Sequence, residues 1–205
     1  MMRGRRIRTM SGLFAVVVMA AGTYVGAQEK PATPAKPAVA KPAAMAASSD
    51  AARGKHLVEV SVCNDCHTPW KMGENGPEPD MTRMLSGHPA DMALPPPPQP
   101  VGPWIVAGAA TFTAWAGPWG VSYTANLTPD KETGLGTWTA QQFIDTIRNG
   151  RVQGHGRQLL PPMPWGWYKN MSDADLKAIF AYLKTIPAVK NKVPDPLPPT
   201  AAPAK

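Results

Sequence analysis

Cysteine and net charge are both scarce in this chain of 205 residues. It has only two cysteines, and its histidines other than His67 show no ligand spacing. A structural zinc site needs four ligands, so such a site is not expected. The formal charge is +7, and it falls to +3 once the four arginines of the first ten residues are set aside. A charge this small and dispersed does not argue for nucleic acid, so no nucleic-acid partner is expected.

Long apolar runs are missing too, apart from one near the N-terminus. Residues 11–27, SGLFAVVVMAAGTYVGA, follow the basic stretch MMRGRRIRTM. A basic start, a short apolar run and small final residues are typical of a secretory signal, so residues 1–27 are interpreted as a signal peptide cleaved after Ala27. The alternative is an uncleaved anchor, which would tether the protein to the membrane. Either interpretation predicts an exported, periplasmic protein.

Proline is abundant, with 25 residues, and it marks two segments that have little to bury. Residues 28–49 are rich in Pro, Ala and Lys and predict a semi-extended linker. Its role is either to hold a domain away from a membrane or partner, or only that of a solvated tail left by processing. Residues 194–205 predict a Pro-rich C-terminal tail. One folded domain is therefore expected over residues 50–193.

Three segments of this domain have helical patterns. Residues 50–63 begin with Asp50 as an expected N-cap, residues 139–150 end on a glycine suited to closing a helix, and residues 172–187 begin with a capping box. Between them, residues 70–138 hold five of the seven tryptophans and show little strand pattern, with residues 121–127 as the best short strand candidate. The expected fold class is all-α, with three main helices and a long Pro- and Trp-rich loop insertion. A loop this long is unusual in a compact domain unless it wraps a large apolar cofactor.

The two cysteines lie in SVCNDCHTPW, as Cys63 and Cys66, directly followed by His67. Cys-x-x-Cys-His is the attachment signature of c-type haem. Each thiol forms a thioether with one vinyl group of the porphyrin, and the spacing lets one helical turn reach both vinyls. The imidazole that follows then reaches the iron as proximal ligand. The sequence therefore predicts one covalently attached haem c.

Two other interpretations of the cysteine pair are weaker. A thioredoxin-like redox pair usually opens a helix after a strand, whereas this pair ends an expected helix. A disulfide between Cys63 and Cys66 would close a very small loop and stabilise little.

The sixth iron ligand decides whether the iron is closed to substrates. Met163 is the favoured residue because it lies in RQLLPPMPWGWY, where prolines fix an extended backbone and remove amide donors next to an apolar pocket. The aromatic residues that follow, Trp165, Trp167 and Tyr168, are expected to cover the cofactor. Other residues of the right type remain alternatives: Met72, Met81, Met84, His88, Met92, His155 and Met171.

The order of these features resembles a class I monohaem cytochrome c, and four further segments are similar to the cytochrome c domains that accompany bacterial periplasmic dehydrogenases for alcohols, aldehydes and sugar acids. The resemblance covers about residues 53–195. It is carried, besides the two motifs, by residues 126–143, 147–150, 156–165 and 172–194.

This resemblance implies a haem held by Cys63, Cys66, His67 and Met163. It also implies that Arg157 binds a haem propionate, with Arg148 as the alternative. It further implies that the first and last helices cross, with Gly54 against Phe180 or Tyr182. Such dehydrogenase subunits commonly carry several haem domains and a membrane anchor, whereas this chain has a single Cys-x-x-Cys-His motif.

Two classes of function follow. The first is an electron carrier and not an enzyme, which accepts single electrons from a dehydrogenase or respiratory complex and passes them to an oxidase or another cytochrome. A variant of it is a haem subunit permanently bound to a catalytic partner. The second class is a haem enzyme or gas-binding protein with an open or displaceable distal position, in which His155 or a tryptophan would act.

Overall fold

The structure is a computed structural model, and it describes residues 42–98 and 102–199. The expected signal peptide, most of the expected linker and residues 200–205 lie outside the described residues. Within the described part of the chain, no helix combines the length and the apolar character needed to cross a bilayer. The described helices are α1 (Pro42–Val60), α2 (Cys63–His67), α3 (Ala140–Asn149), α4 (Trp165–Tyr168) and α5 (Asp173–Leu183), with 3-10 turns η1 (Met81–Arg83) and η2 (Val152–Gly154).

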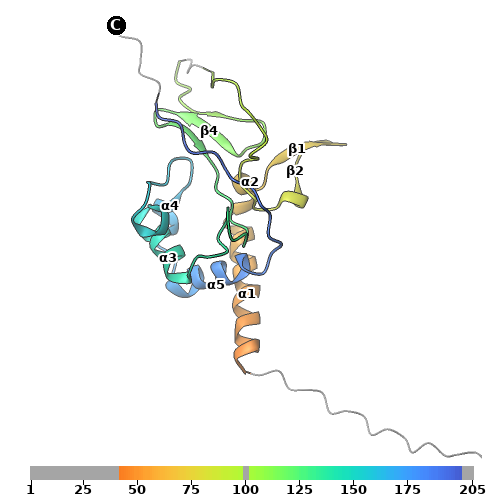
Figure 1. The fold of residues 1–205 in the computed structure, drawn as a ribbon, viewed down its shortest axis with the longest axis vertical. Coiled ribbons are helices and arrows are strands. Elements are labelled where there is room, and N and C mark those ends of the chain that lie inside the picture. The colour runs from red at the N-terminus through yellow and green to blue at the C-terminus, as the bar shows by residue number, and fades with distance from the viewer. Residues whose placement is uncertain (1–41, 99–101, 200–205) are drawn as a thin grey trace, which may run out of the picture. The chain divides into compact units, whose positions relative to one another are not determined.

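The expectation of an all-α fold is wrong, because the Pro- and Trp-rich segment forms two antiparallel sheets (Figure 1). The first is a hairpin of β1 (Trp70–Gly73) and β2 (Gly76–Pro79). The second has the order β3 (Ala107–Gly108), β4 (Ala114–Gly117) and β5 (Gly120–Tyr123). The fold therefore combines helices and sheets.

Glycines close the tight turns of both hairpins. Gly73 pairs with Gly76 and Gly117 pairs with Gly120, and the second glycine of each pair has a positive φ, of 118° and 93°. A side chain disfavours that conformation, so glycine allows the chain to reverse there. The strands have two to four residues each, which is too short to show an alternating pattern in the sequence.

Aromatic contacts connect the two sheets. The ring of Phe112 lies 5.0 Å from that of Trp70 in β1 and 5.8 Å from that of Trp115 in β4, measured between centroids. The amide of Trp70 also donates to the carbonyl of Thr111. The tryptophans of this segment thus help to join two sheets.

Helix α3 lies where the sequence predicts it, and α5 begins where it is predicted but ends at Leu183, before the expected end at Pro187. Thr139 caps α3, with Gln142 completing a capping box, and Gly150 closes the helix in the left-handed conformation with φ 62°. Ser172 caps α5 by accepting from the amide of Asp175. Both N-terminal caps are contacts between residues three positions apart, so the sequence was sufficient to predict where these helices begin.

The first helix differs from the expectation at its start and at its end. It ends at Val60, and Cys63 begins the separate helix α2, so the expectation that the cysteine pair ends the first helix is wrong. Helix α1 begins at Pro42, so Asp50 lies inside the helix and is not its N-cap. The predicted crossing with α5 is confirmed for Tyr182: a Cβ at Gly54 would lie 2.9 Å from the Cβ of Tyr182 and would collide with the carbonyl of Ala178. Glycine therefore lets the two helix backbones come into close contact.

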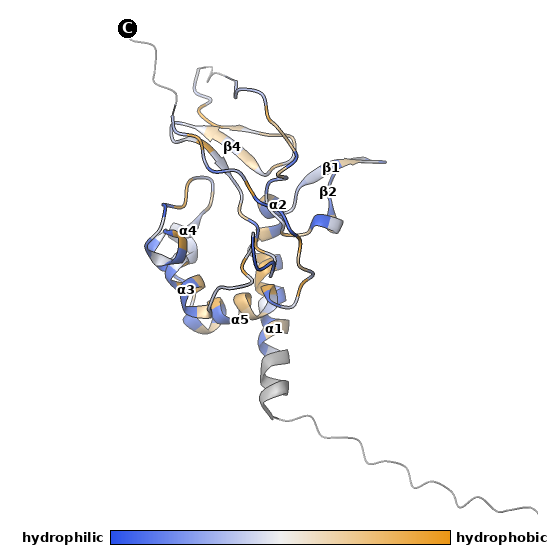
Figure 2. Ribbon diagram, viewed as in Figure 1, coloured by the Kyte–Doolittle hydropathy of each residue, from blue (hydrophilic) through white to orange (hydrophobic). Residues whose placement is uncertain are grey.

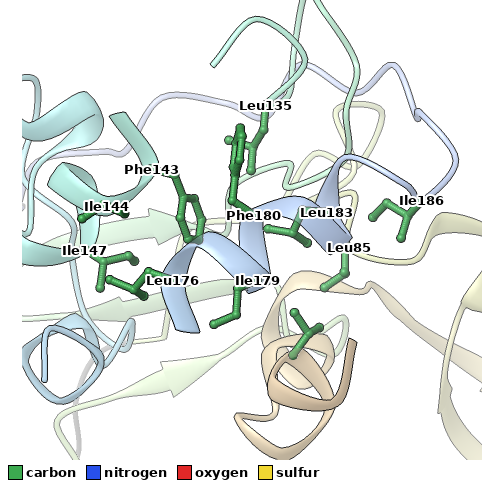
Figure 3. Packing of buried hydrophobic residues seen from close by; sticks show 11 residues of the cluster. Leu85, Leu135, Phe143, Ile144, Ile147, Leu176, Ile179, Phe180, Leu183 and Ile186 are labelled. Carbon is green, nitrogen blue, oxygen red and sulfur yellow. The ribbon is translucent and has the colours of Figure 1, made fainter. Parts of the chain in front are cut away.

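The hydrophobic core lies where α1, α3 and α5 meet (Figure 3). Phe143 and Phe180 pack with ring centroids 5.6 Å apart. Leu85, from the segment after η1, reaches the same core and is fully buried. The buried cluster consists of Val58, Leu85, Leu135, Phe143, Ile144, Ile147, Leu176, Ile179, Phe180, Leu183 and Ile186.

The chain after α5 returns to the three-stranded sheet, as the blue trace of Figure 1 shows. Val121 and Leu197 exchange two backbone hydrogen bonds of 2.9 Å each. Part of the segment expected to be a Pro-rich tail is thus attached to β5.

Candidate functional site

A cavity of about 600 Å³ opens beside the core. This volume falls within the range of about 300–1,000 Å³ in which proteins bury cofactors and other small molecules. The cavity brings together Cys63, Cys66 and His67 from α2 with Arg157 and Met163 from the segment before α4. All five residues that the sequence singled out therefore line one cavity.

The motif CNDCH forms the one-turn helix α2, which places both thiols on the cavity. Neither cysteine forms a disulfide. Burial raises the pKa of Cys63 to about 11. Burial, and after it the charge of Asp65, also raises the pKa of Cys66. A thiol–disulfide redox pair needs a lowered thiol pKa, so these surroundings oppose that interpretation.

His67 has one ring nitrogen engaged. Its Nδ1 lies 2.8 Å from the backbone carbonyl oxygen of Ala125. A carbonyl only accepts, so Nδ1 carries the proton and donates it, and the lone pair is on Nε2. Burial lowers the pKa of His67, which favours the neutral imidazole. A neutral imidazole with a fixed tautomer and a free nitrogen is the form that ligates a metal.

Met163 is half-buried and packs against the core cluster. The segment before it is fixed to the sheet, because the hydroxyl of Ser122 in β5 donates to the carbonyl of Pro161 at 2.6 Å. Met171 also lines the cavity, so the structure leaves two methionines there. The alternatives that do not line it are Met72, Met81, Met84, His88, Met92 and His155.

The expected aromatic cover is only partly present. Trp167 is 79% exposed and does not line the cavity. Trp165 lies against Gly150 at the end of α3. Tyr168 does line the cavity, and its hydroxyl donates to the carbonyl of Ser61, next to the cysteine motif. Trp138 is a further aromatic lining residue that the sequence analysis did not single out.

The two arginines differ in their surroundings. Arg148 forms an ion pair of 2.6 Å with Asp173 and donates to the carbonyl of Lys169. Arg157 lines the cavity, and within residues 42–98 and 102–199 no carboxylate forms an ion pair with it. The guanidinium of Arg157 is therefore the one of the two that remains free to bind an anionic group in the cavity.

Sequence reasoning missed two parts of this site. One is the carbonyl of Ala125, which is a backbone group and leaves no signal in the sequence. The other is the segment Lys192–Asp195, which lines the cavity although it follows the last helix. Its place on the cavity depends on pairing with distant residues, so local patterns do not reveal it.

The donor set and the cavity fit a covalently bound haem. The walls are mainly apolar, with Leu135, Phe143 and Ile179 among the residues that line them. Two half-buried cysteines and one imidazole with a free Nε2 lie on a single helical turn, as covalent attachment and axial ligation require. In the described ranges, no group of three or more His, Cys, Asp or Glu side chains is placed to bind a metal ion by itself.

Comparison with known proteins points in the same direction. No family model matches the chain. It is 29% identical over 186 residues to the fructose dehydrogenase cytochrome subunit of Gluconobacter japonicus, an alignment that covers 88% of this chain and 29% of that protein. It is 43% identical over 67 residues to the gluconate 2-dehydrogenase cytochrome c subunit of Pantoea cypripedii, which covers 33% of this chain and 15% of that protein.

A third relative is the cytochrome c subunit of the quinone-dependent alcohol dehydrogenase of Gluconobacter oxydans, 29% identical over 147 residues, with 70% of this chain and 23% of that protein covered. The chain thus spans less than a third of the length of these curated relatives. Their shared description agrees with the cysteine motif, the imidazole and the cavity. The chain is therefore related to the cytochrome c subunits of bacterial dehydrogenases, and its cofactor is covalently bound haem c.

Proposed function

We propose that this chain is a periplasmic electron-transfer protein and not itself an enzyme. It moves single electrons through a haem iron ligated by His67 and Met163, from a dehydrogenase or respiratory complex to an oxidase or another cytochrome. The observation that carries the proposal is the cavity, on which Cys63, Cys66, His67 and Met163 all lie. When bound there, haem c supplies an iron that takes up and gives up one electron.

The cysteines hold the cofactor covalently. The thiols of Cys63 and Cys66 would each hold one vinyl group of the haem as a thioether, the thiol hydrogen being kept on the vinyl carbon so that no net oxidation is needed. The raised pKa values of Cys63 and Cys66 mean that both residues begin as thiols. Two thioethers on one helical turn fix the position of His67 relative to the ring.

His67 and Met163, from two different segments of the cavity wall, would hold the iron of the bound haem. The Ala125 carbonyl orients the imidazole and raises its basicity. The thioether of Met163 is neutral and soft, which favours the reduced iron and raises the potential. The hydrogen bond from Ser122 to Pro161 fixes the segment that carries Met163, and this rigidity suits electron transfer. Arg157 binds a propionate, because its guanidinium is free and offers a planar fork to a carboxylate.

The direction of electron flow is proposed from the relatives. Those named above are cytochrome subunits of fructose, gluconate and alcohol dehydrogenases. We infer that a dehydrogenase is the electron donor of this chain too. An N-terminal tether, if the expected signal is not cleaved, would hold the protein near such a partner at the membrane.

The test is an absorption spectrum of the mature protein, produced in a periplasm with haem-attachment machinery. Spectra are recorded oxidised, reduced, and reduced under carbon monoxide. Two variants are compared with wild type: Met163→Leu, and Met171→Leu as the matched control, because both methionines line the cavity.

We expect carbon monoxide to leave the reduced spectra of wild type and Met171→Leu unchanged. Both proteins should show a sulfur-to-iron band when oxidised. Met163→Leu should lose that band and bind carbon monoxide. The converse pattern would move the ligand to Met171. Ready carbon monoxide binding by wild type would instead favour the haem enzyme or gas-binding protein.

One observation favours a lasting complex over a freely diffusing carrier. No Asp, Glu, Lys or Arg occurs between Asp91 and Asp130. Within this stretch, Trp104 is 74% and Ile105 is 57% exposed, and Figure 2 colours β4 in orange tones. Permanent interfaces are depleted in charge and enriched in aromatic residues, whereas exposed apolar patches are otherwise rare. The partner that fits is a catalytic dehydrogenase subunit.

Co-purification with a dehydrogenase in high salt tests this form of the proposal. The variant Trp104→Ser/Ile105→Ser should release the partner, whereas Met81→Ser, at an exposed methionine outside the stretch, should not. Complete dissociation of the wild-type complex by salt alone would favour the free carrier.

A further inference from the structure

The segment that follows α5 is anchored at its start by a buried asparagine. Asn191 is 4% exposed. Its side-chain amide nitrogen donates to the carbonyls of Ser86 and His88 at 2.7 and 2.8 Å, and its side-chain oxygen accepts from the amide of Ala90 at 2.8 Å. Its own backbone amide donates to the hydroxyl of Thr133. Two of these hydrogen bonds are buried and two are partly buried, and together they fix Asn191 to two different segments.

The same segment is anchored at its other end by the sheet. Leu197 exchanges two backbone hydrogen bonds with Val121 in β5. Residues 191–197, which we call the C-terminal segment, are thus fixed at both ends. Its blue trace in Figure 1 runs from the region of α5 to the three-stranded sheet.

Four residues between the two anchors, Lys192–Asp195, line the haem cavity. Two of them are charged. In the described part of the chain, neither Lys192 nor Asp195 forms an ion pair, whereas the nearby Lys190 is paired with Glu132 at 2.7 Å. Lys192 and Asp195 therefore bring an unneutralised positive and an unneutralised negative charge to the wall of the cavity.

We propose that the C-terminal segment forms one wall of the haem site, and that Lys192 and Asp195 adjust the reduction potential of the iron in opposite directions. The inference rests on the proposed electron-transfer function, since it assigns new residues to the same site. Asn191 is a positioning residue in this arrangement, because it holds the backbone from which Lys192 extends.

The direction of each effect follows from charge. Reduction adds one negative charge at the iron site, so a nearby ammonium stabilises the reduced form and a nearby carboxylate destabilises it. Lys192 also offers three donors to a propionate, in a charge-assisted hydrogen bond beside that proposed for Arg157. Both side chains are largely exposed, so salt screens part of the effect.

The test is the midpoint potential of the mature holoprotein, measured by spectroscopic titration at low and at moderate ionic strength. Three variants are compared: Lys192→Gln, Asp195→Asn, and Lys177→Gln as the control. Lys177 is an exposed lysine of α5 that does not line the cavity, so its variant loses the same charge away from the site. All three positions are exposed, so the variants are expected to fold.

We expect Lys192→Gln to shift the potential downward and Asp195→Asn to shift it upward, each more at low ionic strength, and Lys177→Gln to leave it nearly unchanged. Equal shifts from Lys192→Gln and Lys177→Gln, or no shift from either cavity variant, would overturn the inference. The reduced spectrum of each variant, recorded without and with carbon monoxide, serves as the check on ligation. If carbon monoxide does not bind and the potentials of the cavity variants do not shift, this inference alone is rejected. If carbon monoxide binds to wild type, the proposed function is rejected.

Discussion

The Nδ1 atom of His67 lies 2.8 Å from the carbonyl oxygen of Ala125. These residues are 58 positions apart, and the contact joins the helical turn that carries the cysteines to the segment after β5. It fixes the ring tautomer and directs Nε2 away from the backbone partner.

This contact predicts where the imidazole proton lies. In the reduced, diamagnetic holoprotein, nitrogen-15 NMR should find the proton of His67 on Nδ1, with slow exchange against solvent because the residue is only 8% exposed. The exposed ring of His155, whose Nδ1 contacts the carbonyl of Gln153 in its own loop, should exchange rapidly and serves as the reference. A proton on Nε2 of His67 would contradict both the hydrogen bond and the proposed ligand role.

The close contact of α1 and α5 at Gly54 predicts that alanine lowers stability there, but not at a glycine with free space around it. Gly54→Ala should lower the free energy of unfolding by roughly 1–3 kcal/mol, because the new methyl group meets the backbone carbonyl of Ala178 and cannot be accommodated by a rotamer change. Gly166→Ala in α4 meets nothing within 4 Å and should be neutral or gain up to about 1 kcal/mol. Guanidinium unfolding of the two holoproteins measures both. Equal effects would mean that the helices do not touch at Gly54.

An ion pair between these helices predicts a pH dependence. Both Nε and Nη2 of Arg53 contact one carboxylate oxygen of Asp175, at 2.8 and 2.5 Å. The side-chain hydrogen bonds from Arg53 and then from Ser172 lower the pKa of Asp175 below its ordinary value of 3.8. Because the folded-state pKa is the lower one, the stabilisation is fully present above pH 3.8 and is lost as the pH falls through the folded-state pKa.

The variant Asp175→Asn should therefore be less stable than wild type at pH 7, and the two melting temperatures should converge in strong acid. Thermal unfolding followed by circular dichroism from pH 7 down to pH 2 tests this. The control Asp145→Asn loses the same charge, but Asp145 accepts from Gln141 on its own helix and does not bridge α1 and α5. A constant difference between Asp175→Asn and wild type over the whole pH range would disprove the linkage.

The hydrogen bonds that anchor the C-terminal segment predict that removing the side-chain amide of Asn191 lowers the stability of the protein strongly. Asn191→Ala leaves the carbonyls of Ser86 and His88 and the amide of Ala90 without their partner, and each unsatisfied buried group costs about 1–3 kcal/mol. We expect a loss of at least 2 kcal/mol in the free energy of unfolding, a rough lower bound from that range. Asn170→Ala, at an exposed asparagine, should change stability by no more than about 0.5 kcal/mol. Similar losses in both variants would argue against the buried network.

The sheets show where local sequence patterns are insufficient. The strand β3 has two residues, and β5 is completed on one side by Leu197, far along the chain. Such short strands are stabilised by their partners and not by their own propensity. The hint of a strand at residues 121–127 was correct for Val121–Tyr123, but nothing in it revealed the pairing.

The site also has some features that local sequence predicts and others that depend on the fold. The cysteine motif is local, since its chemistry depends on residues within one helical turn, and so are the caps of α3 and α5. Other features of the site depend on segments that meet only on folding. They include the choice of methionines that line the cavity, and the ion pair that engages Arg148 but leaves Arg157 free.

The sequence by itself thus determined the cofactor class, helix α3 with both its ends and the start of helix α5, because thiol spacing and capping act over a few residues. The tertiary structure decided the two sheets, the Ala125 carbonyl behind His67 and the wall formed by Lys192–Asp195. Those features are contacts between residues distant in sequence, and they become favourable only when the whole core has formed.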